Sequence, residues 1–538
     1  MTPSGSGTRP APSLARATGS LAIATLVSRI TGFGWKVVLA WVVGFGVVND
    51  SFTIASNFPT IINELLLGGV LSSVVVPLLV RAQKDDPDGG EAYTQRLLTV
   101  GLAVLATGTV IAVACAPLLT AAYTAEAANT ALTTGFTYLM LPAIVFLGLS
   151  AMLMAILNAR QRFTATGWAP VLNNVVMFVV IGLYAVLPGT ITLDPVRMGE
   201  AKLLVLGLGL PLGLASQLLV LVPALRRTGF TFRARWGWDR RLAEFGGLAA
   251  WVVGYTLLGQ VGLAAITNAA TSGEEGGAAI YASTWLLLQF PYGVIGVSLL
   301  TVIMPRMSSA AADGNFPAVI DDLALGSRLS IVLLGPLCAL MTVLGPQIGI
   351  ALYSIGNSDT DATRLGLSIT ASAFGVLPYA IVMLQLRVFY AMKDARTPTL
   401  IMLIMTAVKV PLSYLCAELL DPRSVVYGLS FVNSFTFLVG VLIGEIWLRS
   451  RLGRLRTGEV LRTLVKTLVA ATWGAGAALG IALLLRAGLG PDSVAAAWLS
   501  LILGTLIGGA ITFGLMTLLR VRETGAVVGR ITGRLRRG

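Results

Sequence analysis

The chain has 538 residues, of which 56% are hydrophobic and 12% are charged, and its formal net charge is +13. So small a charged fraction is unusual for a soluble protein. Apolar runs of about 20 residues, long enough to cross a hydrocarbon core of about 30 Å, recur along the chain without the alternation of barrel strands. The sequence therefore predicts an all-α polytopic membrane protein. Its positive charge lies mostly at the ends of the runs, where it sets topology rather than binding nucleic acid.

Residues for catalysis or metal binding are missing from the sequence. The chain has no His, and Cys115, Cys338 and Cys416 are isolated in or near apolar runs. Because these thiols have neither metal-ligand nor redox spacing, we predict that they are buried and inert. There is no phosphate-binding P-loop either. We therefore predict that the protein is not an enzyme and needs no metal or cofactor, so any transport would draw on a gradient or on consumption of its product.

About fourteen transmembrane helices are predicted in chain order. Residues 1–17 are polar, basic and rich in Pro and Gly, which predicts a disordered cytoplasmic segment, and no small-residue cleavage site follows them. The predicted spans are 18–46, 50–81, 94–122, 128–159, 167–188, 201–225, 242–267, 278–308, 320–353, 364–392, 397–419, 424–449, 460–486 and 493–520. The tail at 521–538 is basic and is predicted to be cytoplasmic.

The connections between spans differ in charge. Those after even-numbered spans are basic, as at Arg160 and in the cluster from Arg226 to Arg241, whereas those after odd-numbered spans are mainly acidic, as at Glu274 and Asp359. Basic connections stay on the cytoplasmic side of a membrane. Both termini are therefore predicted to be cytoplasmic, which agrees with an even number of spans.

An internal repeat divides the chain. The dipeptide Phe-Pro at 58–59 recurs at 290–291, and Ala159 at the end of the fourth span recurs at the same offset as Ala391 at the end of the tenth. The offset covers six spans, an even number, so the two halves have the same orientation, as in transporters built from parallel repeats.

The repeat predicts two six-helix lobes with a cavity between them. The first lobe is expected at 18–226 and the second at 227–456. Helices thirteen and fourteen, at 457–520, lie outside the repeat. Two lobes around a cavity are the plan of a transporter.

The first two spans carry polar residues where lipid would not tolerate them: Arg29, Lys36, Asn63 and Glu64. A charge in the middle of a membrane costs roughly 3 kcal/mol, so these side chains should face a cavity. Arg29 and Lys36 share one helix face about 10 Å apart, which favours an anionic cargo. Alternatively, either cation pairs with Glu64 or Asp50 or reaches an interface. Glu64 either neutralises a cation until cargo binds or forms a permanent ion pair.

Several blocks of sequence resemble those of one transporter family. The pattern SRITGF, then ND-F--A---P, then GG-LSS--VP, is similar to the opening of the MviN/MurJ lipid II flippases, which belong to the MOP exporter superfamily. The similarity continues in LNARQRFTATGWAPVLNNVV, QFPYGVIGVSLLTVIMPRMS and RVFYAMKDARTPTLI, and covers roughly residues 18–520.

The resemblance implies a function. Members of this family flip the undecaprenyl-diphosphate-linked peptidoglycan precursor from the cytoplasmic to the outer leaflet of the bacterial plasma (inner) membrane, for cell-wall biosynthesis. It further implies alternating access between the lobes and a lipid-tail groove at helices thirteen and fourteen. The implied partners are a lipid-linked anionic substrate, membrane lipids and proteins of cell-wall synthesis or division.

The resemblance also suggests roles for single residues. Arg29 occupies the Arg of the family's SR pair, one of several cavity arginines, and Asp50 matches an Asp at the start of the second span. Lys36 replaces an acid but supplies a cation near a lost arginine. Other charged positions of the family are occupied here by Trp35, Asn63, Leu286 and Gln289. We expect Arg29, Lys36, Asn63 and Glu64 to form the substrate-binding set.

Four further charges are expected to serve gating or structure: Asp50, Arg387, Lys409 and Glu445. Asp50 is expected at the outer mouth, as a gate partner or as an anion that stabilises a helix N-terminus. Some family members are associated with a sodium site on helices seven, eleven and twelve. The Lys409 ammonium would replace that cation, with Glu445 as a candidate partner, or would form a structural pair.

Arg387 belongs to the cytoplasmic end of span ten, with Lys393, Asp394 and Arg396 nearby. These charges either make gate contacts with Arg160 and Arg162 or with opposing acids, or form a solvated loop.

Two other functions remain open from the sequence. One is a MOP-type carrier of another polyprenyl-linked glycan or of a drug, although a cavity for cationic drugs should be acidic. The other is a flippase-like scaffold for cell-wall synthesis that does not transport, which the missing cavity arginines would favour.

Overall fold

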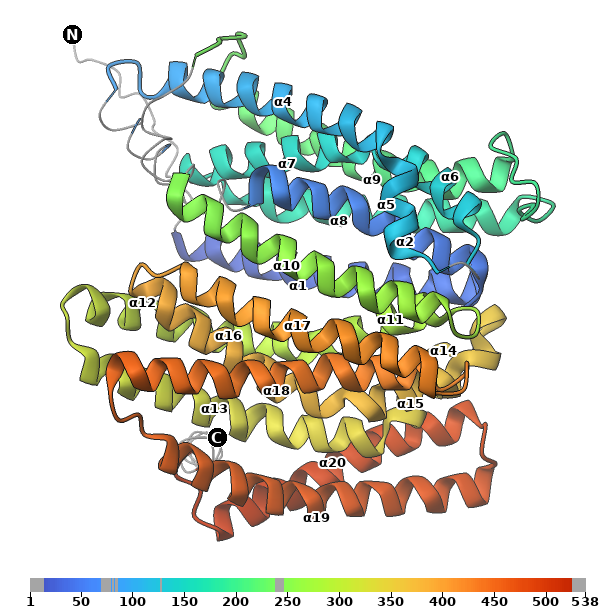
Figure 1. Cartoon of the computed structure of the whole chain (residues 1–538), viewed down its shortest axis with the longest axis vertical. Coiled ribbons are helices and arrows are strands. Elements are labelled where there is room, and N and C mark those ends of the chain that lie inside the picture. Colours follow the sequence, from blue (N-terminus) through green and yellow to red (C-terminus); the bar gives the residue numbers. More distant parts are fainter. Residues whose placement is uncertain are drawn as a thin grey trace, which may run out of the picture. The chain divides into compact units, whose positions relative to one another are not determined.

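The structure is a computed structural model that describes residues 14–68, 79, 82, 86–125, 128–237 and 246–524. Within these ranges all regular elements are helices, which confirms the predicted all-α class (Figure 1). Most of the predicted N-terminal segment, all but the first residues of the basic tail and the end of the Arg226–Arg241 cluster lie outside the described residues.

The helices of the first part of the chain are α1 (Leu14–Val43), α2 (Val47–Asn63), the π-helical η1 (Glu64–Gly68), α4 (Glu91–Ala114), α5 (Ala116–Tyr123), α6 (Thr130–Met140), α7 (Ala143–Ala159), α8 (Phe163–Val186) and α9 (Ala201–Arg226). Those of the second part are α10 (Gly246–Thr271), α11 (Gly277–Pro291), the π-helical η4 (Tyr292–Gly296), α12 (Val297–Ala312), α13 (Phe316–Val343), α14 (Gly345–Tyr353), the 3-10 helix η5 (Gly356–Asp361), α15 (Ala362–Ser372), the 3-10 helix η6 (Ala373–Gly375), α16 (Val376–Ala391), α17 (Arg396–Leu419), α18 (Val425–Leu452), α19 (Thr457–Leu489) and α20 (Val494–Leu518).

The described residues contain 12 helices long and apolar enough to cross a membrane, or 13 with the bent pair α6 and α7. The count of fourteen is therefore not confirmed, and part of the predicted span at 50–81 lies outside the described residues. The predicted span at 128–159 bends by 42° between α6 and α7. Pro142 lies at that break, where its missing N–H interrupts the helical hydrogen bonds.

Phe-Pro precedes a π-helical turn in both halves of the chain. Pro59 lies inside α2 shortly before η1, and Pro291 ends α11 directly before η4. Pro has no backbone N–H to donate to the carbonyl four residues before it. The backbone hydrogen bonds nearby therefore shift from the four-residue spacing of an α-helix to the five-residue spacing of a π-helix. The sequence repeat thus recurs as the same local departure from α-helical geometry.

The described chain divides into two compact units, which are considered separately. The first comprises residues up to 38, 55–116 and 134–246, and the second comprises 39–54, 117–133 and the residues from 247 onward. The α1–α2 hairpin region and the segment around α5 thus group with the second unit, although the repeat assigns both to the first lobe. The predicted lobes and the separate helix pair at 457–520 rest on the repeat and stay a prediction.

Close approaches through glycine shape the first unit. α8 packs along α9, α9 also packs on α7, and α7 on α4. A Cβ at Gly209 on α9 would lie 2.5 Å from Val180 on α8, and one at Gly213 would clash with the Asn173 side chain. Small residues let helix backbones approach where no hydrophobic effect drives their association. α8 and α9 are therefore in close contact at these glycines.

The second unit ends in a tightly packed helix pair, α19 and α20. Small residues fill the contact: a Cβ at Gly508 would lie 2.6 Å from the Gly474 carbonyl oxygen, and Ala470, Ala478 and Ser500 are buried. α19 also packs on α13, and α20 on α14. This pair is the predicted helices thirteen and fourteen.

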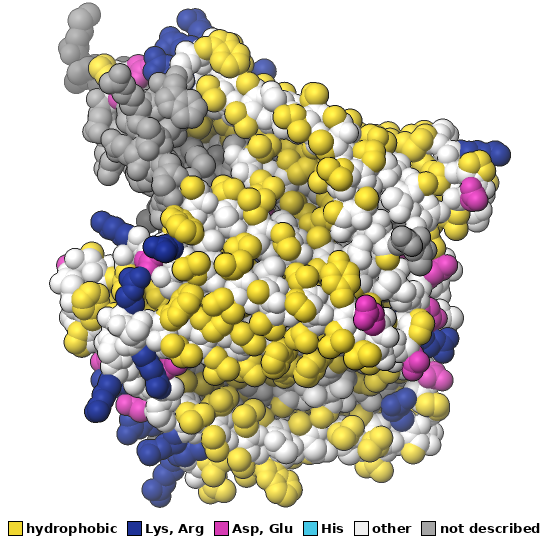
Figure 2. All heavy atoms as spheres, in the orientation of Figure 1, with side chains coloured by type: hydrophobic (Ala, Val, Ile, Leu, Met, Phe, Trp, Pro, Cys, Tyr) yellow, Lys and Arg dark blue, Asp and Glu magenta, His cyan; other side chains and the backbone are white. Residues whose placement is uncertain are grey.

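Charge is distributed unevenly along the helices of the second unit. Figure 2 shows hydrophobic side chains over their middle and Lys and Arg mainly at their left ends. We call the end with the α18–α19 connection, 449–456, the basic end, and the end with Glu274, Glu275 and Asp359 the acidic end. This distribution agrees with helices that cross a membrane.

The cysteine prediction was partly wrong. Cys338 is buried, but Cys416 is half-buried and Cys115 is exposed. Cys115 lies between α4 and α5. An exposed apolar side chain in a membrane protein contacts lipid rather than water, so burial in protein is not required at such a position.

Candidate functional site

The two predicted cargo cations lie on α1. Arg29 and Lys36 are both exposed in the structure. Among the residues that the structure describes, neither side chain forms an ion pair, and the Lys36 ammonium lies 5.7 Å from the centroid of the Trp35 ring. The predicted alternative, a pair with Glu64 or Asp50, is therefore not found among the described residues. A cation with no protein counter-ion in a membrane-spanning helix is available to an anionic ligand.

The other two members of the predicted set lie at the end of α2. Asn63 Oδ1 is buried without a hydrogen-bond partner among the described residues, and a Cβ added to Gly148 on α7 would lie 2.9 Å from it. Asn63 thus turns toward α7, inside the first unit. Glu64, by contrast, is exposed and begins the π-helical turn η1. Asn63 is thus half-buried with its Oδ1 turned inward, and Glu64 is the more exposed of the two residues.

Asp50 caps a helix that begins more than 200 residues later in the chain. Its carboxylate accepts the backbone N–H of Gly276 at 2.9 Å and that of Ala279 at 2.8 Å, at the start of α11. The side chain is buried, with 8% of the residue exposed. A carboxylate at this position accepts hydrogen bonds from backbone N–H groups that have no partner within the helix. It also interacts favourably with the positive end of the helix dipole. Asp50 therefore caps α11 with its hydrogen bonds while it also lies in the first turn of α2.

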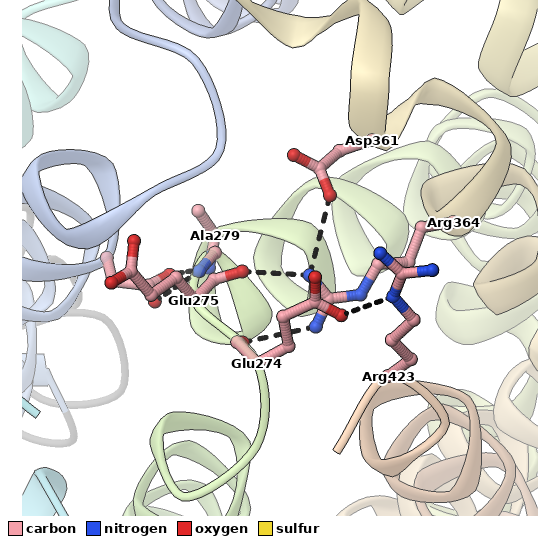
Figure 3. Close-up of polar contacts among 8 residues, drawn as sticks. Glu274, Glu275, Ala279, Asp361, Arg364 and Arg423 are labelled. Carbon is pink, nitrogen blue, oxygen red and sulfur yellow. Dashed lines mark hydrogen bonds and ion pairs between the residues drawn. The ribbon is translucent and has the colours of Figure 1, made fainter. Parts of the chain in front are cut away.

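Arg364 holds the loop that leads into α11. Its guanidinium donates to the carbonyl of Glu275 at 2.8 Å and of Glu274 at 3.1 Å, and it lies 3.4 Å from Asp361 Oδ1 (Figure 3). Arg423 pairs with the Glu274 carboxylate at 3.0 Å. The sequence analysis missed Arg364; the available signal was a basic residue within an otherwise acidic connection. We name Asp50, Gly276, Ala279 and Arg364 the acidic-end latch.

The residues before Asp50 are held at the same end. Trp41 Nε1 donates to the carbonyl of Leu352 at 2.7 Å, and Asn357 Nδ2 donates to that of Val42 at 2.7 Å. Gly276 has a φ of 82°, and a Cβ there would lie 2.5 Å from the Phe45 carbonyl oxygen. Glycine suits both the conformation and the close approach. The turn between α1 and α2 is therefore fixed to α11, α14 and η5.

Lys409 joins three helices of the second unit. Its ammonium donates to Asn433 Oδ1 on α18 at 2.8 Å, and it lies 5.7 Å from the centroid of the Phe437 ring. The side-chain stem passes α10, where a Cβ at Gly262 would lie 3.1 Å from Lys409 Cδ. These are the predicted helices seven, eleven and twelve. No cluster of three or more metal-ligating residues occurs in the described ranges.

Glu445 was wrongly named as a partner for Lys409. It accepts from Arg449 at 3.2 Å and from the hydroxyl of Thr457, at the basic end of the second unit. Glu445 and the Lys409 partner Asn433 are separated by more than three turns of α18. This distance along the helix excludes a shared contact, so Glu445 connects α18 to the start of α19 instead.

Arg387 and its neighbours lie toward the basic end of α16. Arg387 is exposed and forms no ion pair with a described residue. Asp394 accepts the backbone N–H and the hydroxyl of Thr397 and pairs with Arg451 at 3.1 Å. Burial raises the pKa of Asp394, but the Thr397 hydrogen bonds and Arg451 outweigh it, so the net pKa is lowered. The predicted charges are thus partly paired within the second unit.

Comparison with known proteins places these features in a family. The model of the family described as "Lipid II flippase MurJ" matches residues 39–524. The chain is 27% identical over 414 residues to the "Probable lipid II flippase MurJ" of Rhizobium tropici, covering 75% of each chain. It is 23% identical over 484 residues to the protein of that name from Haemophilus influenzae, covering 84% of this chain and 90% of the relative.

Solved structures show the same fold. "Lipid II flippase MurJ, inward closed conformation" matches with a TM-score of 0.69 and 17% identity, covering 91% of this chain and 97% of that one. An inward-facing multidrug-resistance MATE family transporter of the MOP superfamily matches with a TM-score of 0.63 and 15% identity, covering 81% and 98%. At these identities the likeness concerns the fold alone.

Proposed function

Because the chain belongs to the MurJ lipid II flippase family, we propose that it moves lipid II from the cytoplasmic to the outer leaflet of the bacterial inner membrane by alternating access. The observation that carries this proposal is the family match over residues 39–524. Both termini lie in the cytoplasm in this proposal, since the basic connections belong there. The protein performs no catalytic step, and its partners are lipid II and, at the membrane, proteins of cell-wall synthesis.

Arg29 and Lys36 would bind the diphosphate of the cargo. Both cations are exposed on α1 and have no acidic partner among the described residues. Arg29 offers a planar fork for two phosphate oxygens, whereas the Lys36 ammonium acts as a point charge. Exposed Glu64, in the same unit, is the acid that balances these cations when no cargo is bound. Asn63 is a supporting residue, because its side chain turns toward α7.

The acidic-end latch would be the outer gate. Alternating access requires that one mouth is closed while the other is open. Asp50 and Arg364 hold the loop and first turn of α11 with hydrogen bonds that join segments far apart in the sequence. Opening this end requires that those bonds break, so the latch sets the free energy of the closed state.

The polyprenyl tail would lie at α19 and α20. A cavity of about 530 Å³ on this pair is lined by Trp473, Gly476, Ala477, Ile511 and Leu515. Its lining is almost entirely apolar, as a hydrocarbon chain requires. Small residues in the helix contact keep the pair together beneath this surface.

The decisive experiment is translocation of lipid II by the purified full chain in vesicles. We expect flipping by the wild type and its loss in Arg29→Ala, with Arg197→Ala as the control, because Arg197 is an exposed arginine in a loop of the same unit. Translocation of another polyprenyl-linked glycan in place of lipid II would establish the carrier alternative. No translocation of either lipid, together with no rescue of growth in a flippase-depleted strain, would establish the scaffold alternative.

A further inference from the structure

A basic cavity lies at one end of the first unit, remote in sequence from the cations of α1. Its volume is about 600 Å³, and its lining includes Arg160, Arg162 and Arg227 together with Asp88 and Glu91. The lining comes from the start of α4, the α7–α8 turn and the end of α9 (Figure 1). Basic pockets between the ends of membrane helices are sites for anionic lipid headgroups.

The two acids of this cavity are already engaged. Asp88 accepts the backbone N–H of Gly90 at 3.0 Å and that of Ala92 at 2.7 Å, at the start of α4, which follows it. Glu91 Oε1 accepts from Gln95 at 3.2 Å and from the Thr231 hydroxyl at 3.3 Å. These carboxylates form no ion pair with a described residue; the charge of Glu91 acts on Arg160, and Arg162 and Arg227 are left available.

The arginines themselves are held in position but not neutralised. Arg160 donates to the Thr228 hydroxyl at 2.8 Å, and its guanidinium lies 5.3 Å from the centroid of the Phe230 ring. Arg162 and Arg227 are exposed and have no ion-pair partner in the described part of the chain. Three guanidinium groups against two carboxylates leave the cavity positive, which suits one phosphate.

The repeat offers a comparison inside the same chain. Gln161 follows α7 with a φ of 58°, and its counterpart after α16, Lys393, has a φ of 59°. The next residue is Asp394 in the second unit, where Arg451 neutralises it at 3.1 Å. In the first unit the corresponding residue is Arg162, which lines the cavity. The same turn is thus closed by an ion pair in one unit and left cationic in the other.

An apolar cavity adjoins the basic one. Its volume is about 480 Å³, it shares Arg162 and Arg227 with the basic cavity, and Trp168, Leu219 and Pro223 lie along it. Trp168 is 41% exposed and Leu219 is 74% exposed, on helices that are long and apolar enough to cross a membrane. Tryptophan near the end of such a helix is typical of the membrane interface. A phosphate beside a hydrocarbon surface is the chemistry of a phospholipid.

We propose that this pair of cavities binds an anionic phospholipid of the leaflet at the end of the first unit where Arg160, Arg162 and Arg227 lie. Its phosphate lies among Arg160, Arg162 and Arg227, and an acyl chain lies along Trp168 and Leu219. A soluble phosphate would leave the apolar cavity unused. Such a lipid holds the ends of α8 and α9 and the α7–α8 turn together, and it is a ligand distinct from transported cargo.

The test measures binding of phosphatidylglycerol to the purified full chain in detergent, by native mass spectrometry and by the thermal unfolding midpoint. We expect phosphatidylglycerol to bind and to raise the midpoint, and phosphatidylcholine to do so less. The double variant Arg162→Gln/Arg227→Gln should weaken binding roughly tenfold or more, from the loss of two cations near the phosphate. Arg226→Gln is the matched control, because Arg226 is exposed at the same helix end but lines neither cavity.

A second pair of variants tests the acyl contact. Leu219→Asn should weaken phosphatidylglycerol binding, whereas Leu212→Asn should not, since Leu212 is 58% exposed on the same helix but lines neither cavity. Phosphatidylglycerol with brominated chains should quench Trp168 fluorescence, which is measured as the difference between wild type and Trp168→Phe.

Four results would overturn the proposal: equal weakening in Arg226→Gln, equal binding of phosphatidylcholine, full competition by inorganic phosphate, or displacement of phosphatidylglycerol from this site by lipid II. The last result would identify an entry site for cargo instead. Because none of these measurements uses translocation, failure of the flippase proposal would leave this test unaffected.

Discussion

Removal of the Asp50 carboxylate should loosen the acidic-end latch. Asp50→Ala deletes two charge-assisted hydrogen bonds, to the backbone N–H groups of Gly276 and Ala279, inside a buried contact. Hydrogen bonds to a charged group are worth about 1.5–3 kcal/mol each. Hydrogen bonds to water replace part of this free energy once the acidic end opens. We therefore expect Asp50→Ala to destabilise the closed state, relative to the open state, by at least about 2 kcal/mol. That is about a 30-fold change in the equilibrium between closed and open.

The assay uses one buried reporter cysteine. Cys115, Cys338 and Cys416 are first replaced, and Thr133→Cys is introduced, since Thr133 is only 1% exposed and lies 3.0 Å from the Ser51 hydroxyl beside Asp50. A water-soluble maleimide then labels the reporter only while the latch is open. If opening and closing are fast, the labelling rate follows the open population. Asp50→Ala should raise that rate about 30-fold, and Asp50→Asn less, because the amide keeps one acceptor oxygen.

The control is Asp359→Ala at the same end, since Asp359 is an exposed acid. An equal rise of the labelling rate in Asp359→Ala would mean that the negative charge of this end, rather than the Asp50 cap on α11, keeps the end closed. An unchanged rate in Asp50→Ala, at normal abundance in the membrane, would refute the assignment of Asp50 to the latch.

Three further predictions concern topology, cargo and Lys409. Probes at Glu274 should react with an impermeant thiol reagent from outside the cell and probes at Arg235 should not; the reverse pattern would contradict the orientation. Arg29→Ala should weaken lipid II binding about ten- to a hundredfold, the equivalent of one charge-assisted contact of about 1.5–3 kcal/mol, with Arg29→Lys intermediate; full complementation by Arg29→Ala at normal abundance would make this cation structural. Translocation by the wild type should be unchanged when choline replaces sodium. Lys409→Ala should lower the thermal unfolding midpoint or create a sodium requirement, because the substitution leaves Asn433 without its donor. A sodium requirement in the wild type, with no effect of the substitution, would reject this role of Lys409.

The sequence predicted most spans because hydrocarbon thickness and the absence of water impose long apolar helices. It could not give breaks inside those runs. The bend at Pro142 and the division of the span at 278–308 into α11, η4 and α12 leave hydropathy almost unchanged. Hydropathy records how apolar a segment is, whereas a break depends on single backbone hydrogen bonds.

Polar partners were predicted less well than spans. Lys409 was expected where α10, α17 and α18 meet, and the structure brings it to Asn433 there, but Glu445 proved to be held by Arg449. Asp50 was expected at a helix N-terminus, yet nothing in the spacing could identify α11 as that helix. A carboxylate has no preference among the backbone N–H groups of different helices, so the choice comes from tertiary packing.

The partners of Asp50 also have a consequence for biogenesis. A ribosome delivers the α1–α2 hairpin long before Gly276 and Ala279, whose N–H groups the carboxylate accepts. Domains fold progressively from the N-terminus as they are made. Until α11 has been inserted, the nascent chain therefore carries a carboxylate that lacks these donors and an end that cannot be sealed. The permeability barrier at this end thus arises only after about half of the polypeptide has been made, and a chain truncated before α11 would lack it.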